Sequence, residues 1–388
     1  MKKNEKKLNE DNNPFFYRQR PLIIAELGTS HNGDIVKARE MIDAAAKAGA
    51  DCVKFQMVFA DEILHPNTGE VALPGGIIRL YDRFKTLEMP REFYAEIKEY
   101  VESRGLLFLC TPFGLKSASI LREIRPKIVK IASPELNYTS LLEEVAGWNL
   151  PILLSSGVSR LSDIEEALAI LMGSRDAATQ RWGVGSKETH SPICLLHCVT
   201  SYPAPETDYN LRLLPNLSAI FGVPVGVSDH SSDPELVPAL AVCMGAVVIE
   251  KHFCLSRNAP GLDDPIALPP QEFSKMVRAV RLAAEDGREK TIARYSGERG
   301  EAFVEQVLGT GVKQLAPSER ENYSRTNRSI HALRDIQKGE ILKRSDYAVL
   351  RTEKILRPGL DPRWEKTLEG KTAQQFIPAG EGIRFEDV

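Results

Sequence analysis

The chain has 388 residues, of which 43% are hydrophobic and 27% charged, and its formal net charge is -3. This length suffices for one domain of about 250 residues and a smaller second one. The basic residues are balanced by acidic ones and do not gather into a stripe, so we expect no nucleic-acid partner.

The N-terminal segment 1–20 is polar and lacks an apolar stretch, so it is typical neither of a signal peptide nor of a membrane span. We expect a disordered or loosely docked arm, and no membrane partner. The six cysteines lie mostly in apolar stretches, and none forms a Cys-x-x-Cys pair. This usage is typical of reduced core thiols in a cytoplasmic protein.

From residue 21 onward, short β-rich segments alternate with amphipathic helical ones, which indicates βα units around a parallel sheet. Eight repeats are the number that closes a barrel. An open doubly wound sheet is the alternative, but its Gly-x-Gly-x-x-Gly fingerprint is absent near the first turn. The predicted strands are 22–27, 52–56, 106–111, 128–133, 152–156, 193–199, 225–230 and 247–253, and the clearest helices are 35–48, 91–103, 162–172 and 270–285.

Turn signals predict a long loop over 57–90, and loops of this length in compact domains are usually functional. A surface loop is expected over 173–191. We assign 21–290 to the barrel and the polar stretch 291–327 to an interdomain linker. Residues 328–388 alternate like strands and contain many turns, so we expect a small β-rich unit there.

Two predicted strands end in Ser-Asp-His and Glu-Lys-His, which places His230 and His252 at neighbouring strand ends. The carboxyl ends of barrel strands meet at one face, where two imidazoles can share a divalent metal. Because Asp229 and Glu250 flank the pair, we favour a metal site over two unrelated histidines. Ligand type alone allows Mn²⁺, Mg²⁺, Co²⁺ or Zn²⁺, and such an ion would polarise a carbonyl oxygen.

Lys54 and Lys130 lie inside predicted strands, where an unpaired ammonium group is costly to bury, so each is expected to face an anion or a carboxylate. One alternative is that both lysines form ion pairs with Glu26 and Glu250. Another is a Schiff-base aldolase with one lysine as nucleophile, although the histidine pair favours the metal. Hydroxyl groups expected around the same strand ends belong to Thr111, Ser133, Ser155 and Ser228.

Several motifs in order resemble the sialic acid synthases. They span 23–34, 48–56, 111–114, 129–133, 227–230 and 249–253. Residues 328–388 resemble the antifreeze-like, or SAF, domain of these enzymes, so the resemblance covers nearly all of 21–388. It implies a (β/α)8 TIM barrel followed by a small β-clip-like domain.

The resemblance implies condensation of phosphoenolpyruvate with the open-chain aldehyde of an N-acylated amino sugar, giving a nine-carbon 2-keto acid and phosphate. A metal on His230 and His252, with Mn²⁺ preferred over Mg²⁺ or Co²⁺, would activate the aldehyde. Glu26, Glu250 and Asp229 are the candidate catalytic residues. Positions matching the family's anion-binding residues are Lys54, Thr111, Lys130, Ser133, Ser155 and Ser228, and the sugar side would include Thr200, Tyr202, Asp263 and Arg328.

In this family the C-terminal domain reaches into the partner's barrel. The resemblance therefore implies a domain-swapped homodimer in which Arg328 contacts the sugar bound by the other chain. Three departures surround the sugar side. Asp264 stands where the family commonly has histidine, Thr200 where many members have asparagine, and Pro134 where glycine is usual.

These departures weaken the case for N-acetylmannosamine as acceptor and leave diacetamido sugars, with legionaminic- or pseudaminic-type products, open. A different barrel carbon–carbon lyase or synthase and a non-catalytic homologue are the remaining alternatives. The presence of Glu26, both lysines, Asp229, Glu250 and both histidines argues against lost activity.

Overall fold

The computed structural model describes residues 16, 20–73, 76–176 and 193–388. Most of the predicted arm 1–20 and of the predicted loop 173–191 therefore lies outside the described residues. No helix in the described part of the chain is long and apolar enough to cross a membrane.

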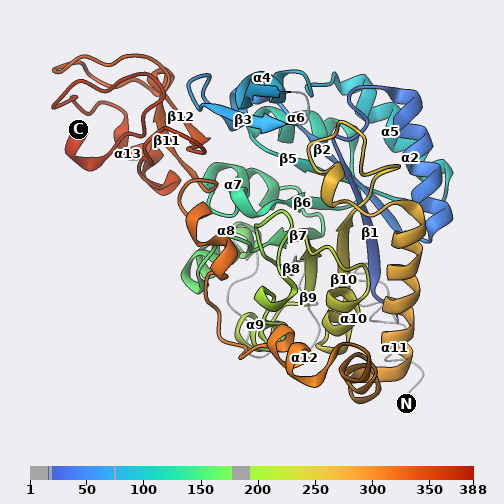
Figure 1. Ribbon diagram of the computed structural model, residues 1–388. Coiled ribbons are helices and arrows are strands. Elements are labelled where there is room, and N and C mark those ends of the chain that lie inside the picture. The colour runs from blue at the N-terminus through green and yellow to red at the C-terminus, as the bar shows by residue number, and fades with distance from the viewer. Residues whose placement is uncertain (1–15, 17–19, 74–75, 177–192) are drawn as a thin grey trace.

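A parallel sheet of eight strands forms the centre of the molecule, in the order β5-β2-β1-β10-β9-β8-β7-β6 (Figure 1). β5 and β6, at the two ends of this order, pack against each other and close the barrel. The predicted (β/α)8 barrel is thus confirmed. Its strands are β1 (Leu22–Gly28), β2 (Cys52–Met57), β5 (Leu107–Pro112), β6 (Val129–Ile131), β7 (Ile152–Ser155), β8 (Ile193–Cys198), β9 (Val225–Asp229) and β10 (Val248–His252).

Helices surround the barrel, and α2 (Ile35–Ala48) shows why they form. Asp34 caps it by accepting hydrogen bonds from two backbone N–H groups of the first turn. Gly49, at φ 97°, ends it in the left-handed conformation that glycine tolerates. The other surrounding helices are α5 (Arg91–Ser103), α6 (Leu115–Ile124), α7 (Thr139–Ala146), α8 (Leu161–Asp176), α9 (Leu213–Phe221), α10 (Leu236–Cys243) and α11 (Pro270–Arg299).

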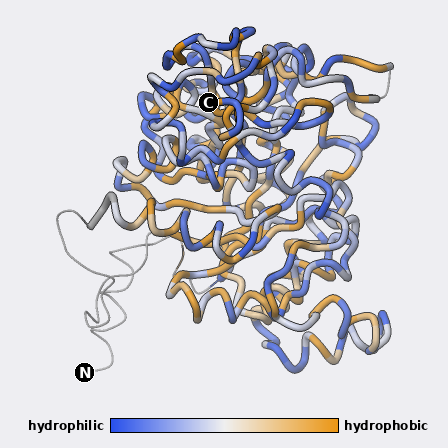
Figure 2. The backbone as a smooth tube through the Cα atoms, turned by 90° about the vertical axis from the view of Figure 1, so that its left-hand side faces the viewer, coloured by the Kyte–Doolittle hydropathy of each residue, from blue (hydrophilic) through white to orange (hydrophobic). Residues whose placement is uncertain are grey.

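An apolar cluster fills one end of the barrel interior. It takes alternate residues from nearly every strand, because successive side chains of a strand point to opposite faces. Phe16, only 1% exposed, packs into this cluster, so this residue of the predicted arm is firmly docked. Figure 2 shows hydrophobic segments running through the middle of the molecule. The cluster comprises Phe16, Leu22, Ile24, Cys52, Leu109, Ile128, Leu153, Cys194, Leu196 and Val248.

The predicted loop 57–90 contains regular structure, so this prediction was wrong. The antiparallel hairpin of β3 (Glu70–Leu73) and β4 (Gly76–Arg79) is flanked by two short helices, α3 (Ala60–Ile63) and α4 (Leu80–Lys85). A separate apolar cluster, which includes Ile63 and Leu87, joins the two short helices to the barrel loops. Each of these helices and strands is too short for its hydrophobic periodicity to be recognised in the sequence. The turn residues were therefore the stronger signal, and they indicated a loop.

The segment after the barrel is also more regular than expected. α11 continues to Arg299, past a kink at Gly287, and α12 (Glu301–Leu308) follows. The stretch expected to be a linker, 291–327, therefore begins inside a helix and is fastened to the barrel, since the Arg212 guanidinium pairs with Glu305. Short 3-10 helices throughout the chain are η1 (Ser133–Glu135), η2 (Glu206–Asp208), η3 (Asp264–Ile266), η4 (Pro317–Asn322), η5 (Arg344–Asp346), η6 (Pro362–Trp364) and η7 (Phe385–Asp387).

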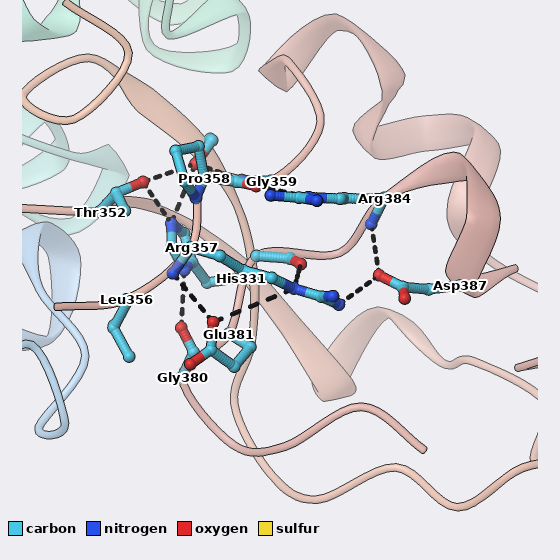
Figure 3. A network of polar contacts seen from close by, with 12 residues as sticks. His331, Thr352, Leu356, Arg357, Pro358, Gly359, Gly380, Glu381, Arg384 and Asp387 are labelled. Atoms are coloured by element: carbon cyan, nitrogen blue, oxygen red, sulfur yellow. Dashed lines mark hydrogen bonds and ion pairs between the residues drawn. The ribbon is translucent and has the colours of Figure 1, made fainter. Parts of the chain in front are cut away.

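The C-terminal unit, 328–388, has one antiparallel strand pair, β11 (Arg328–Ala332) and β12 (Tyr347–Arg351), with a short helix α13 (Glu365–Leu368). A polar network supplements its small core (Figure 3). The Arg357 guanidinium donates to Asp387 at 2.6 Å, and the Arg357 backbone N–H donates to Glu381 at 2.9 Å. These bonds tie the loops together where strands are few.

Candidate active site

A cavity of about 380 Å³ opens at the carboxyl ends of the barrel strands. This is the face where enzymes of this fold place their active sites. The cavity is lined by every predicted site residue except Thr111, Asp229 and Arg328. The predicted residues that line it are Glu26, Lys54, Lys130, Ser133, Ser155, Thr200, Tyr202, Ser228, His230, Glu250, His252 and Asp263.

The floor of the cavity is a buried cluster of two lysines and two glutamates. Glu250 Oε1 accepts hydrogen bonds from Lys54 Nζ at 2.6 Å, Lys130 Nζ at 3.0 Å and Ser228 Oγ at 2.9 Å. Lys54 Nζ also lies 3.1 Å from Glu26 Oε2. The ion pairs considered as an alternative therefore exist. All of these side chains nevertheless line the cavity, so a ligand can reach them.

The two carboxylates of this cluster differ in acidity. Burial would raise the pKa of Glu250, but the ammonium groups of Lys130 and Lys54 hold it well below its usual range. For Glu26, burial outweighs the attraction of Lys54 and raises the pKa to about 7. When Glu26 is protonated, two ammonium groups face one carboxylate, so the cluster carries a net positive charge that favours an anion.

Free hydroxyl groups lie above this cluster. Ser155 Oγ and Thr200 Oγ1 are buried without a hydrogen-bond partner within the described chain, which leaves them available to a ligand. Ser133 Oγ accepts a hydrogen bond from the Gly157 backbone N–H at 2.9 Å. A Cβ at Gly157 would lie 2.2 Å from Thr200 Oγ1, so only glycine allows this close packing.

The two histidines lie together in the same cavity, with ring centroids 5.4 Å apart. His230 Nδ1 lies 2.8 Å from the Val199 carbonyl oxygen, to which an Nδ1–H can donate. That tautomer leaves the lone pair of His230 on Nε2, which is 3.3 Å from the Tyr202 hydroxyl. Tyr202 stacks on His230 at 4.3 Å between centroids. His252 Nδ1 is 3.7 Å from Asp263 Oδ2.

The chemistry of these side chains fits a divalent cation. Burial and the neighbouring His230 lower the pKa of His252 well below its usual value, which keeps its imidazole neutral. Burial opposes a proton on His230 as well, but the adjacent Cys198 thiol raises the pKa of His230. A cation at His230 would therefore compete with a proton. No ready-made group of three or more His, Cys, Asp or Glu ligands exists among the described residues, so solvent or substrate oxygens would complete the coordination.

Asp229 does not line the cavity, although we expected it to be catalytic. Ser228 points into the barrel, and alternation along β9 turns its neighbour Asp229 to the outer face. There Asp229 Oδ2 accepts from Lys251 Nζ at 2.6 Å, and both side chains are buried. The structure therefore makes Asp229 part of a buried ion pair behind the site. Thr111 faces inward on β5 but lies outside the cavity lining.

Arg328 likewise does not reach the cavity. Its fully buried guanidinium pairs with Glu135 Oε1 at 2.9 Å, and Arg351 donates to the same oxygen at 2.7 Å. This contact joins the C-terminal unit to its own barrel in the single chain. Arg351, rather than Arg328, lines the cavity, together with Glu353 and Lys354.

Several lining residues escaped sequence analysis. Gln56 donates to Glu26 Oε1 at 2.7 Å, and Cys198 lies beside His230. Strand alternation could have found both, because each lies two or four residues from an inward-facing side chain. Arg351 and Asn322 come from the C-terminal unit and the linker, and no local pattern relates them to the barrel.

The fold and site define a barrel enzyme whose cavity is lined by buried lysines, glutamates and hydroxyl groups and by an imidazole pair. The NeuB family model matches residues 41–290, and the SAF domain model matches residues 327–388. The chain belongs to the NeuB family, which confirms the resemblance to the sialic acid synthases and an enzyme of that type.

Individual relatives agree with this membership. The chain is 36% identical to the spore coat polysaccharide biosynthesis protein SpsE of Bacillus subtilis, over 94% of this chain and 93% of that protein. The crystal structure of SpsE is similar with a TM-score of 0.75, at 35% identity and 95% coverage of both chains. The N,N'-diacetyllegionaminic acid synthase of Campylobacter jejuni is 33% identical over 86% of this chain and 91% of its own length.

Proposed function

We propose that this protein condenses phosphoenolpyruvate with the open-chain aldehyde of an N-acylated amino sugar, forming a nine-carbon 2-keto sugar acid and phosphate. The observation that carries the proposal is a single cavity that is lined both by lysines and hydroxyl groups and by an imidazole pair. Family membership and the synthase names of relatives support it.

The floor suits phosphoenolpyruvate, which carries a phosphate and a carboxylate. Lys54 and Lys130 supply positive charge, and the unpaired hydroxyls of Ser155 and Thr200 supply hydrogen bonds. Because Glu250 holds both ammonium groups on one oxygen, the charges are positioned before the substrate arrives. Arg351 adds a third cation at the cavity wall.

The part of the cavity around His230 and His252 suits the sugar aldehyde. A divalent cation held by His230 and His252, with Mn²⁺ our preferred choice, would polarise the aldehyde oxygen when bound. C3 of phosphoenolpyruvate attacks the aldehyde carbon, water adds at C2, and phosphate leaves by cleavage of the C2–O bond. Glu26, with a pKa raised to about 7, can take the proton that the attacking water releases and give it to the oxygen of the former aldehyde, which becomes a hydroxyl group.

The acceptor is an N-acylated amino sugar, either N-acetylmannosamine or a 2,4-diacetamido hexose. Asp264, which replaces the family's usual histidine, is fully buried and accepts from the Gly261 backbone N–H at 2.8 Å. It therefore holds the loop and does not contact the sugar. Leu262 and Asp263 line the cavity at this point. The similarity to the N,N'-diacetyllegionaminic acid synthase of Campylobacter jejuni favours a diacetamido acceptor.

We further propose a homodimer that exchanges its C-terminal units. The contact of Arg328 with Glu135 lies within one chain here, but an identical contact between two chains would bury the same groups. Exchange of an element between identical chains keeps every native contact and changes only which chain supplies it.

The test is phosphate release from phosphoenolpyruvate with added Mn²⁺ or Mg²⁺. N-Acetylmannosamine, its 6-phosphate and diacetamido hexoses are offered separately, with a chelated control. We expect sugar-dependent release that the chelator abolishes and a matching excess of divalent metal restores. Release that resists chelation, together with borohydride trapping of a lysine, would instead support a Schiff-base lyase. No release with any sugar from folded, metal-loaded protein would favour a non-catalytic homologue.

A further inference from the structure

The interdomain linker runs across the two loops that follow β7 and β8, and four of its side chains bond to the backbone of these loops. Lys313 Nζ donates to the Ser156 carbonyl at 3.2 Å. The other three are Glu319, Asn322 and Asn327. Glu319 Oε2 accepts from the N–H groups of Val158 at 3.0 Å and Thr200 at 2.9 Å. Asn322 donates to the Thr200 carbonyl at 2.9 Å, and Asn327 donates to the Val158 carbonyl at 3.0 Å. The backbone N–H and C=O groups of Val158 and Thr200 therefore form hydrogen bonds with side chains of the linker.

Glu319 is the centre of this arrangement. It is 1% exposed, and its second oxygen accepts from the Ala316 backbone N–H at 3.1 Å. In the described part of the chain its carboxylate forms no ion pair within 4 Å, so three backbone N–H groups are its hydrogen-bond partners. Hydrogen bonds to an ionised group are stronger than neutral ones, and a buried carboxylate that lost them would be costly.

The two loops carry part of the cavity wall. Val158 adopts φ 43°, a left-handed conformation that a β-branched side chain disfavours, so external bonds are needed to hold it. Just before it lie Ser155, whose hydroxyl is free, and Gly157, whose N–H donates to Ser133. A shift of either loop would therefore displace the Ser155 and Thr200 hydroxyls.

We propose that Glu319 is a positioning residue for the anion-binding side of the site. By holding Val158 and Thr200 in register, it sets the hydroxyls that receive phosphoenolpyruvate. This inference rests on the proposed function and deepens it. It makes the linker a component of the active site, because the linker supplies the hydrogen bonds to the backbone N–H groups of Val158 and Thr200.

The Glu319→Gln variant tests the proposal. A carboxamide has one acceptor oxygen and no charge. It loses either the bond from Ala316 or the two bonds from Val158 and Thr200, and any bonds to the loops that remain are weakened because the acceptor is neutral. We expect the Kd for phosphoenolpyruvate, measured calorimetrically without sugar, to rise about tenfold, or about 1.4 kcal/mol. The KM for the sugar should change less than about twofold. Glu321→Gln, the same change at an exposed position two residues along, should match the wild type.

Two results would overturn the inference. One is folded Glu319→Gln with the phosphoenolpyruvate affinity of Glu321→Gln. The other is a parallel rise in both KM values with a loss of kcat, which would indicate a general structural role. If Glu319→Gln does not fold, Asn327→Ala, which removes the bond to the Val158 carbonyl, is judged by the same measurements. The proposed function itself fails when the wild type releases no phosphate, whereas the inference alone fails when the wild type is active and the variant is unimpaired.

Discussion

At the scale of single residues, Glu250 is a buried carboxylate whose environment depends on its charge. Its Oε1 atom serves two ammonium groups and one hydroxyl, all buried. Removing the carboxylate charge would leave the two buried ammonium groups facing each other without the acceptor that they share. A buried group that loses its partner costs far more than the intact pair contributes, so this position couples stability to substrate binding.

We therefore expect Glu250→Gln to reduce phosphate release at least about 100-fold and to lower the free energy of unfolding by about 3 kcal/mol. Steady-state kinetics and urea unfolding measure the two effects. Glu99→Gln, on the exposed face of α5, serves as the matched control and should change neither. Phosphate release close to the wild-type rate would show that Glu250 does not organise the lysines.

His331 predicts a pH dependence of stability. Burial lowers its pKa from 6.5 to about 4. Its ring contacts the Gly380 carbonyl through Nδ1 at 2.7 Å and Ser329 through Nε2 at 2.9 Å. The unfolded chain therefore binds the extra proton first. Stability is fully present above the unfolded pKa near 6.5 and falls as the pH drops toward 4.

For this group the loss amounts to about 2 kcal/mol at pH 5. His331→Asn keeps a donor near Gly380 but cannot be protonated, so its urea midpoint should fall less between pH 7.5 and pH 5 than that of the wild type. Other buried histidines contribute equally to both proteins and cancel in the comparison. Equal shifts in the two midpoints would count against the assignment.

At the scale of elements, the alternation of side chains along the barrel strands separates residues that line the cavity from residues that form an ion pair behind it. Inward positions of β9 and β10 hold Ser228 and Glu250, whereas the adjacent outward positions hold Asp229 and Lys251. The inner pair faces the cavity and the outer pair joins the two strands from behind. A shift of one residue in register would exchange the two sets, so both pairs specify the same register.

This separation predicts that Asp229→Asn destabilises the protein by about 3 kcal/mol, because it leaves the Lys251 ammonium buried without its carboxylate. The kcat/KM of the folded variant should stay within about tenfold of the wild type, as expected for a group that touches no substrate. Thermal unfolding and kinetics at a temperature where the variant is folded would decide. Loss of kcat at unchanged stability would restore the catalytic role that the sequence first indicated.

At the scale of the whole molecule, a buried contact around Glu135 sets the C-terminal unit on the barrel. Arg328 and Arg351 share one oxygen of this carboxylate, and Arg351 continues to the cavity wall. Docking of the C-terminal unit on the barrel therefore also completes the cavity wall. Any chain that supplies this unit also supplies Arg351.

Subunit mixing tests the proposed exchange. Arg328→Ala should weaken docking, and His230→Ala should disable the barrel, so each parent dimer is inactive. In an exchanged mixed dimer, one site combines the intact barrel of one chain with the intact C-terminal unit of the other. We expect the mixture to recover about a quarter of wild-type activity. No recovery, with mixed dimers verified by mass, would mean that the contact stays within one chain.

The parts of the fold and of the site that could be predicted from the sequence are those that depend on residues close together in the chain. Lys54, Lys130 and Glu250 were placed correctly at one face, because strand order and alternation are local properties of the sequence. Asp229 was predicted to face the site, but it lies one position after the inward-facing Ser228, and adjacent residues of a strand point to opposite faces. Phe16 was missed, since one aromatic residue in a polar segment gives no periodic signal.

The sequence by itself determined the barrel, the positions of its lysines and histidines, and membership of the NeuB family. All three follow from patterns within a strand, a turn or a short motif. The tertiary structure alone decided that Arg351 lines the cavity, that Arg328 is buried against Glu135, and that Glu319 holds two active-site loops. These pairings join residues far apart in the chain, and only the packing of the complete fold determines which of them meet.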